Sequence, residues 1–327
     1  MDAGGITVVV PVWNRRELIE PVMRTLRAQT AAPAEVIVVD DGSTDGAGAA
    51  AAAAGARVLR MERNTGFAAA VNRGIRACRS QWIAVVNNDV TLAPDYFERL
   101  RTAAGDGTWF ATGKIFSATG GSILDATFDV LSRGGTAWRA GNGEPDSPEW
   151  SVPRAIWSAP WTAVLFRTAL FDRIGLLDET FESYMEDVEF GVRCALGKVQ
   201  GVYVPDAVAW HAGSATLGRW HADTSRRISR NQTLLAARYF PLSFAWPVLV
   251  GQGLWGLVAL RHGAGMAWLH GKLQAARNWH AVRGTYRHQS AERLKSWLEE
   301  NERLLARARS PYWRVYSLLT RVGQSDT

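Results

Sequence analysis

Five side chains in this 327-residue chain have types and spacings suited to metal binding and general-base chemistry. Asp89 follows an apolar run and two asparagines, Glu186, Asp187 and Glu189 lie in one short acidic segment, and His211 follows a tryptophan. An aspartate at the end of a buried strand offers oxygen to Mg²⁺ or Mn²⁺, which take their remaining ligands from water and substrate phosphates. An imidazole at His211 suits Mn²⁺ better than Mg²⁺.

Asp187 is the candidate general base. Three aromatic residues stand near it in the sequence: Phe181, Tyr184 and Phe190. An apolar setting raises the pKa of a carboxylate towards the range useful for a base. Glu186 and Glu189 compete for the same role. Their i, i+3 spacing puts them on one helix face, and Asp187 lies about 100° around the helix from Glu186.

Each of these features also has an ordinary structural interpretation. A turn such as Asp40-Asp41-Gly42-Ser43 caps helices about as often as it binds ligands, and Asp89 can belong to a simple turn. A lone histidine such as His211 is usually a core or surface residue, and an acidic run at 186–189 is usually a solvated helix face. Their joint occurrence in order at predicted strand ends favours one site.

The elements that must position these residues alternate between strand and helix. We expect strands at 6–10, 36–39, 58–61 and 82–86, and helices that follow Asn14, at 47–54 and at 67–79. This alternation predicts a mostly parallel sheet with helices on both faces, and ligands of such sheets bind beyond the carboxyl ends of the strands. Asn14 with Glu17 three residues later predicts a capping box at the first helix.

Helix signals are weak between residues 105 and 155, where we expect loops and irregular strands over a cleft. Order returns with a strand at 163–166 and a helix from Thr168, and a strand at 202–205 leads to His211. Trp157 and Trp161 either stack on a ligand ring or pack in the core.

The last hundred residues differ in composition from the rest. Residues 226–327 contain 16 Lys and Arg against 5 Asp and Glu, and 242–260 contains no charged residue. The glycines and Pro247 in that stretch favour a helix lying in a membrane interface or a re-entrant one, with a spanning helix and a buried hairpin left open. Residues 291–309 form an amphipathic helix that either packs on a neighbour or lies on lipid.

Cysteine usage and charge distribution limit the class of protein. Cys78 and Cys194 lie far apart, so we expect neither a disulfide framework nor a zinc knuckle, and a reducing cytosolic compartment. We expect no secretory signal, because no basic segment followed by an apolar one opens the chain. Nucleic-acid binding is not expected, since the basic residues lie in an apolar tail without a reader motif.

Six motifs in the right order give the chain a family resemblance over about residues 5 to 215. They are Val8-Val9-Val10-Pro11-Val12-Trp13-Asn14, Val38-Val39-Asp40-Asp41-Gly42-Ser43-Thr44-Asp45, Arg63-Asn64-Thr65-Gly66-Phe67, Asn87-Asn88-Asp89, Tyr184-Met185-Glu186-Asp187 and Trp210-His211-Ala212-Gly213. The chain resembles the inverting GT-A glycosyltransferases of family 2, and most of all their bacterial rhamnosyltransferase branch. The resemblance implies an α/β GT-A fold with a mostly parallel, Rossmann-like sheet flanked by helices, here followed by a helical C-terminal extension.

The resemblance also assigns site residues. It implies that Asp187 is the catalytic base, that Asp89 and His211 hold Mg²⁺ or Mn²⁺, and that a further set binds the nucleotide-sugar: Pro11, Asn14, Asp41, Asn64, Gly66, Asn88 and Asp89. Asn87 stands where the metal motif of the family has a first aspartate, which removes one charge from the site. A base aligned opposite the leaving diphosphate implies inversion at the sugar carbon.

Together these observations predict a transferase that moves a sugar, best L-rhamnose from dTDP-rhamnose, onto a cell-surface or lipid-linked glycan. A UDP-hexose donor and a catalytically silent, membrane-associated binder of sugar nucleotides stay as alternatives. We expect a transferase domain at 1–225, with a nucleotide half to about 110 and an acceptor half after it, and a basic extension at 226–327. The extension predicts a peripheral location on the inner face of the plasma membrane and leaves a homodimer open.

Overall fold

The computed structural model describes residues 4–213, 220–277, 282 and 291–321. The chain divides into two compact units that are each discontinuous in sequence. The first unit comprises Met1–Phe128 with Gly141–Thr216, and the second comprises Asp129–Ala140 with Leu217–Thr327. The domain limits near residues 110 and 225 stay predictions; the second unit also includes a hairpin from the middle of the chain.

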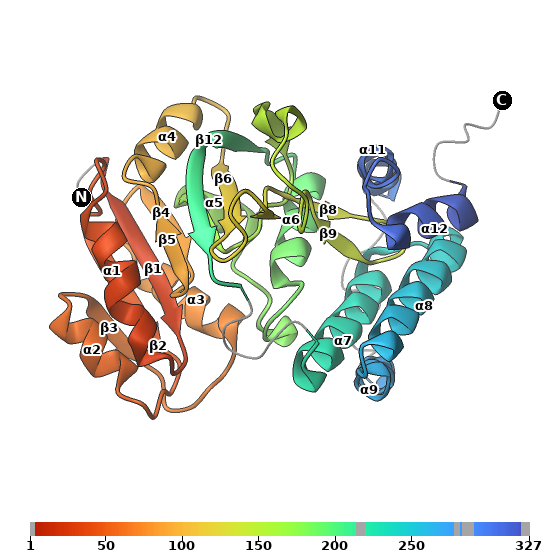
Figure 1. Cartoon of the computed structure of the whole chain (residues 1–327), viewed down its shortest axis with the longest axis horizontal. Coiled ribbons are helices and arrows are strands. Elements are labelled where there is room, and N and C mark those ends of the chain that lie inside the picture. The colour runs from red at the N-terminus through yellow and green to blue at the C-terminus, as the bar shows by residue number, and fades with distance from the viewer. Residues whose placement is uncertain (1–3, 214–219, 278–281, 283–290, 322–327) are drawn as a thin grey trace. The chain divides into compact units, whose positions relative to one another are not determined.

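The first unit is built on a 10-stranded sheet whose main path runs β10-β12-β6-β11-β4-β1-β2-β3, with β5 beside β12 and β7 beside β6 (Figure 1). The strands are β1 (Ile6–Val12), β2 (Glu35–Asp40), β3 (Arg57–Arg60), β4 (Trp82–Val86), β5 (Val90–Leu92), β6 (Phe110–Ser117), β7 (Leu124–Ala126), β10 (Arg154–Ile156), β11 (Ala163–Arg167) and β12 (Gly201–His211). The predicted strands at 6–10, 36–39, 58–61, 82–86, 163–166 and 202–205 are confirmed.

Helices cover both faces of this sheet, as the strand–helix alternation predicts. They are α1 (Ile19–Arg27), α2 (Ala47–Ala53), α3 (Phe67–Ala77), α4 (Tyr96–Ala103), α5 (Ala169–Ile174) and α6 (Glu186–Leu196), with short 3₁₀ turns at Arg16–Leu18, Pro148–Ser151 and Glu179–Phe181. Val8 and Val10 of β1 pack into one core with α1, α2 and α4. On the opposite face α3 lies so close that a Cβ at Gly74 would meet Val9 at 2.3 Å.

The sheet is parallel in its first half and mixed in its second. β3, β2, β1 and β4 pair in parallel, and β11 is antiparallel to both β4 and β6. β6 and β12 are parallel to each other, so they run in the same direction as β4. Residues 105–155, predicted as loops and irregular strands, contain one regular strand inside the sheet, the eight-residue β6, whose glycine, serine and threonine conceal its pattern.

The capping box predicted at Asn14 and Glu17 is also wrong. Asn14 and Arg15 both have left-handed backbone angles, with φ of 58° and 62°, so the chain turns before the helix begins. The Asn14 side chain accepts a hydrogen bond from the Thr44 amide at 2.9 Å. Asn14 therefore joins two loops at strand ends and does not cap α1.

The second unit consists of helices and one β-hairpin. The helices are α7 (Ala222–Tyr239), α8 (Ala245–Arg261) with a 3₁₀ turn at Leu242–Phe244, α9 (Gly265–Arg277), α11 (Ala291–Leu305) and α12 (Pro311–Thr320), and the hairpin is formed by β8 (Asp129–Leu131) and β9 (Ala137–Arg139). The apolar face of α11 is buried at Leu294, Trp297, Leu298 and Leu305. Of the two interpretations of this amphipathic helix, the packed one is therefore correct.

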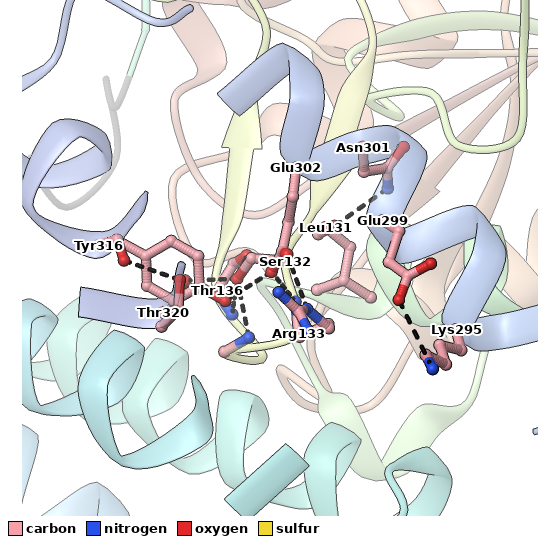
Figure 2. A network of polar contacts seen from close by, with 11 residues as sticks. Leu131, Ser132, Arg133, Thr136, Lys295, Glu299, Asn301, Glu302, Tyr316 and Thr320 are labelled. Carbon is pink, nitrogen blue, oxygen red and sulfur yellow. Dashed lines mark hydrogen bonds and ion pairs between the residues drawn. The ribbon is translucent and has the colours of Figure 1, made fainter. Parts of the chain in front are cut away.

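A buried carboxylate joins the hairpin to the helices of this unit. Glu302 on α11 is 1% exposed and accepts hydrogen bonds from the Arg133 amide at 2.9 Å and from the Arg133 guanidinium at 2.7 Å. The Tyr316 hydroxyl of α12 donates to the same carboxylate at 2.6 Å, as Figure 2 shows. Removing one partner of such a buried pair costs about 3–5 kcal/mol, so the hairpin is an integral part of the second unit.

Candidate functional site

The carboxyl ends of five parallel strands meet at one edge of the sheet. Because β1, β2, β4, β6 and β12 run in the same direction, the residues after them lie along that edge. Pro11 lies at the end of β1, Asp41 follows β2, Asp89 lies between β4 and β5, and His211 ends β12. The predicted site residues are thus on the side of the sheet where ligands of open α/β folds bind.

Asp89 and His211 are brought into direct contact, and a third residue joins them. His211 Nε2 lies 3.2 Å from Asp89 Oδ1, and His211 Nδ1 lies 2.8 Å from Asp125 Oδ2. The side chains are 8%, 10% and 17% exposed for His211, Asp89 and Asp125. Burial alone lowers the pKa of His211, but its hydrogen bonds to Asp125 and Asp89 outweigh this and raise the pKa to about 9.

Donor atoms at this edge fit a hard divalent cation in part. Asp89 supplies a carboxylate and His211 an imidazole, while no group of three or more His, Cys, Asp or Glu side chains suited to a metal occurs among the described residues. The Asn87 side-chain oxygen is buried and has no hydrogen-bond partner within the described ranges. Such a set suits Mg²⁺ or Mn²⁺, which complete their shells with water and phosphate oxygens.

The candidate nucleotide-binding residues lie in loops that Asp41 holds together. Asp41 Oδ1 accepts from the Thr65 amide and Oδ2 accepts from the Gly66 amide, both at 2.9 Å. The carboxylate is 4% exposed, so its first task is to hold the 64–66 loop against the end of β2. Of the remaining pocket candidates, Asn64 is exposed, whereas Pro11 and Asn88 are half-buried.

Gly66 places the 64–66 loop next to the segment that leads to the candidate base. It has φ of 97°, and a Cβ there would lie 2.9 Å from the Glu182 carbonyl oxygen. That carbonyl accepts a hydrogen bond from Ala68 in the first turn of α3, and the Ser183 hydroxyl accepts one from the Phe67 amide. Any side chain at Gly66 would therefore separate α3 from the segment before α6.

The segment before α6 has an unusual backbone. Glu182, Tyr184 and Met185 have φ of 60°, 71° and 69°, and such non-glycine residues cost of order 1 kcal/mol or more each. The turn ends where α6 begins, which puts Asp187 in the first helical turn, where the helix dipole stabilises a carboxylate. The interpretation of 186–189 as a solvated face is wrong, because Glu186, Asp187 and Glu189 are 6%, 8% and 1% exposed.

Glu189 has a structural partner, which separates it from its two acidic neighbours. Arg193 lies one turn later on α6 and its Nη2 is 2.8 Å from Glu189 Oε2. The same guanidinium donates to the carbonyl oxygens of Ile174 and Leu176. Glu189 thus neutralises an arginine that fastens α6 to the end of α5, and only Glu186 remains as a rival base.

Trp161, one of the two tryptophans considered for sugar stacking, belongs to the core. It is 3% exposed and its ring packs within 6.3 Å of the rings of Phe166, Phe171 and Phe190. Trp157 is half-buried. Phe190, one of the aromatic residues expected near Asp187, belongs to the same cluster. Through it α6 packs against Phe166 of β11 and Phe171 of α5.

Asp125 is the site residue that the sequence did not indicate. It lies on the short strand β7, 86 residues before His211 and outside every motif with a recognisable spacing. Only a signal for β7 as a strand beside β6 could have suggested it, and the glycines and serine at 120–122 conceal that signal.

Comparison with known proteins identifies relatives of this chain among the glycosyltransferases. Residues 7–129 match the family model described as glycosyl transferase family 2. The chain is 28% identical over 242 residues to the N-acetylglucosaminyl-diphospho-decaprenol L-rhamnosyltransferase of Mycobacterium tuberculosis, covering 65% of this chain and 78% of that protein. It is 29% identical over 225 residues to a pre-mycofactocin glycosyltransferase of the same species, covering 66% of this chain and 44% of that one.

Two solved structures share the fold at low sequence identity. GalNAc-T7 with UDP, GalNAc and Mn²⁺ aligns with a TM-score of 0.61 at 14% identity, over 77% of this chain and 51% of that one. The mannosyltransferase PcManGT of Pyrobaculum calidifontis, in complex with GDP-Man and Mn²⁺, aligns with a TM-score of 0.54 at 16% identity, over 99% and 88%. The α/β GT-A fold is therefore confirmed, and the chain is a glycosyltransferase whose residues 7–129 match family 2 and which resembles the rhamnosyltransferases.

Proposed function

We propose that this chain transfers L-rhamnose from dTDP-rhamnose, with inversion and with a divalent cation, to a polyprenyl-diphosphate-linked glycan. The observation that carries the proposal is the contact between Asp89 and His211 at the strand ends, on the same side of the sheet as Asp41, whose 64–66 loop packs against the segment that leads to Asp187. The donor and acceptor are taken from the rhamnosyltransferase relative, whose name contains both a decaprenol diphosphate and L-rhamnose.

In this proposal each residue has one chemical task. Asp187 takes the proton from the acceptor hydroxyl as that oxygen attacks the anomeric carbon and the bond to the nucleoside diphosphate breaks. Asp41 keeps the 64–66 loop in place against the nucleoside. Asp89 and His211 would hold Mg²⁺ or Mn²⁺, and the bound ion would supply charge that stabilises the departing diphosphate.

The test is release of nucleoside diphosphate by the purified chain with Mn²⁺ or Mg²⁺. The donors are dTDP-rhamnose, UDP-glucose, UDP-galactose and GDP-mannose, each with and without a polyprenyl-diphosphate-linked N-acetylglucosamine acceptor. Release from dTDP-rhamnose alone, dependent on the acceptor, is the expected result. Release from a UDP-hexose would replace the donor and keep the mechanism, whereas nucleotide binding by calorimetry without any release would favour the silent binder.

We also propose that the second unit holds the enzyme at a membrane surface. Large apolar side chains are exposed on three of its helices and on the 3₁₀ turn before α8, and we call this set the apolar face: Leu242, Trp246, Leu249, Leu257, Leu260, Met266, Leu269, Leu273, Val315, Leu318 and Leu319. Trp246 of α8 donates to the Leu319 carbonyl of α12 at 3.0 Å, and Leu260 lies against Gly265 at the start of α9. The apolar face is therefore continuous along α8.

The sequence that contains most of the apolar face is basic, which fits anionic lipid. Residues 224–291 contain nine Lys and Arg and no Asp or Glu. Each basic residue near an anionic surface contributes about 1 kcal/mol to binding. Leu242–Arg261 is the one described helical segment long and apolar enough to cross a bilayer, but a third of it is buried, and by itself this is weak evidence. We therefore propose that α8 lies in the plane of the cytoplasmic surface of the membrane.

Two leucines of α8 provide the test. Leu249 and Leu257 are 69% and 63% exposed, so the double change Leu249→Glu with Leu257→Glu alters the surface without opening the core. We expect binding to phosphatidylglycerol vesicles in co-sedimentation to fall at least about 10-fold, since each leucine that enters lipid contributes about 1.5–3 kcal/mol. Val152→Glu, at a residue of the first unit that is 55% exposed, is the matched control. Equal sedimentation of all three proteins would refute the proposed membrane contact.

A further inference from the structure

Asp125 reaches the candidate metal site because of a bulge in the sheet. On β7, Ala126 pairs with Ile115 of β6, and Leu124 pairs with the very next residue, Phe116. Two steps along β7 thus correspond to one step along β6, which leaves Asp125 as the extra residue. Bulges of this kind re-aim a side chain and are common beside active sites.

The backbone around Asp125 is held on both sides. The Asn142 side chain donates to the Asp125 carbonyl oxygen at 2.7 Å, and the Gly143 amide donates to the Leu124 carbonyl oxygen at 2.9 Å. Leu124 and Ala126 are 1% and 0% exposed, so both neighbours are fixed in the core. The Asp125 carboxylate therefore stands on a rigid strand, and its position does not depend on a mobile loop.

The His211 ring is fixed by contacts at both nitrogens. Nδ1 faces Asp125 Oδ2 at 2.8 Å, and Nε2 faces Asp89 Oδ1 at 3.2 Å. A ring flip would break the shorter contact and turn Nε2 away from Asp89. In histidines that bind metal, a carboxylate on the second nitrogen sets the tautomer and the ring direction, and its loss costs about 10- to 100-fold in metal affinity.

We infer that Asp125 is a positioning residue that keeps the proton of His211 on Nδ1 and so leaves the Nε2 lone pair directed at the cation held with Asp89. This inference rests on the proposed metal-dependent function. In this inference Asp125 binds neither the cation nor the substrate. Its effect on transfer is exerted through the direction and tautomer of one imidazole ring.

The test compares Asp125→Ala and Asp125→Asn with a control that removes a carboxylate of similar setting. Asp146 lies 2.8 Å from Lys114 Nζ in the same unit and is not a partner of His211, so Asp146→Ala loses a part-buried ion pair without touching the ring. Mn²⁺ affinity is measured by the electron paramagnetic resonance of the free ion in the presence of dTDP. Asp125→Asn keeps the shape of the side chain in case Asp125→Ala fails to fold.

The expected result is a Mn²⁺ dissociation constant about 10- to 100-fold higher for Asp125→Ala, an intermediate value for Asp125→Asn and a nearly unchanged value for Asp146→Ala. In ¹⁵N spectra of the Mg²⁺-saturated protein, His211 should show the Nδ1-protonated pattern in the wild type and a mixture of tautomers in Asp125→Ala. A metal affinity within twofold of wild type in both Asp125 variants would overturn this inference and leave the proposed function intact. An equal loss of metal affinity in Asp146→Ala would do the same. If the wild type itself binds Mn²⁺ no better than Asp89→Ala, the proposed metal site falls, and the inference falls with it.

Discussion

Replacing Asp187 by asparagine should lower sugar transfer by about 10²- to 10⁴-fold and leave donor binding intact, because a positioned general base contributes about this much to the rate. Asp187 is buried in the first turn of α6, where its Oδ1 accepts from the Val188 amide at 2.9 Å. Asparagine has the same shape and keeps an acceptor for that bond, but it cannot take a proton. Nucleoside diphosphate release measures the rate, and calorimetry with the donor measures binding.

Two neighbours of Asp187 provide the comparison. Glu189→Gln should lower the melting temperature, because Arg193 would lose its buried carboxylate partner, and breaking such a pair costs about 3–5 kcal/mol. Asp187→Asn should melt close to the wild type. Full transfer activity in Asp187→Asn would reject it as the base and direct the same test to Glu186.

Replacing Asp89 by alanine should remove the metal dependence of transfer and lower the rate by about 10²- to 10³-fold. Losses of this size follow the removal of one group that stabilises the charge developing in a transition state. Asp89 is the carboxylate that faces His211 Nε2. Without it, His211 is the one that remains of the two candidate metal ligands. The measurement is a titration of nucleoside diphosphate release against Mn²⁺. Wild type should saturate, and the variant should stay low at every concentration.

Asp95→Ala is the matched control for this change. Asp95 forms an ion pair with Arg99 at 2.6 Å on the surface, and exposed pairs contribute about 0–1 kcal/mol. Its variant should follow the wild-type titration. A normal Mn²⁺ response in Asp89→Ala would contradict the assignment of the metal to this strand end.

The nucleotide-binding half of the fold is readable from sequence because its signals are local. β1, β2, β3 and β4 are β-branched or apolar runs separated by helices, and each lies within a few residues of its predicted limits. The same locality explains the error at Asn14, where a capping-box spacing is present but the side chain binds Thr44, 30 residues away. A local pattern cannot report a partner that only the folded chain supplies.

The part of the site that the sequence does not reveal depends on pairing between distant strands. β6 enters the sheet between β11 and β12, and its neighbours in space come from residues 163–167 and 201–211. Asp125 meets His211 only after β7 has added to β6 with a bulge. The ordinary interpretation of the acidic segment at 186–189 as a solvated face fails for a related reason, since burial by the rest of the first unit overrides the usual preference of charged residues for solvent.

The hairpin at 129–140 has a consequence for how the chain is made and how it can be cut. Arg133 and its partner Glu302 are 169 residues apart, so at about 5–20 residues per second the ribosome takes roughly ten to thirty seconds to supply the second after the first. During that interval Arg133 lacks its carboxylate, and folding of the second unit must wait for the end of synthesis. A truncation after residue 225 would leave the hairpin behind without its helices, so a transplant of the C-terminal helices into a related enzyme should carry the hairpin with them.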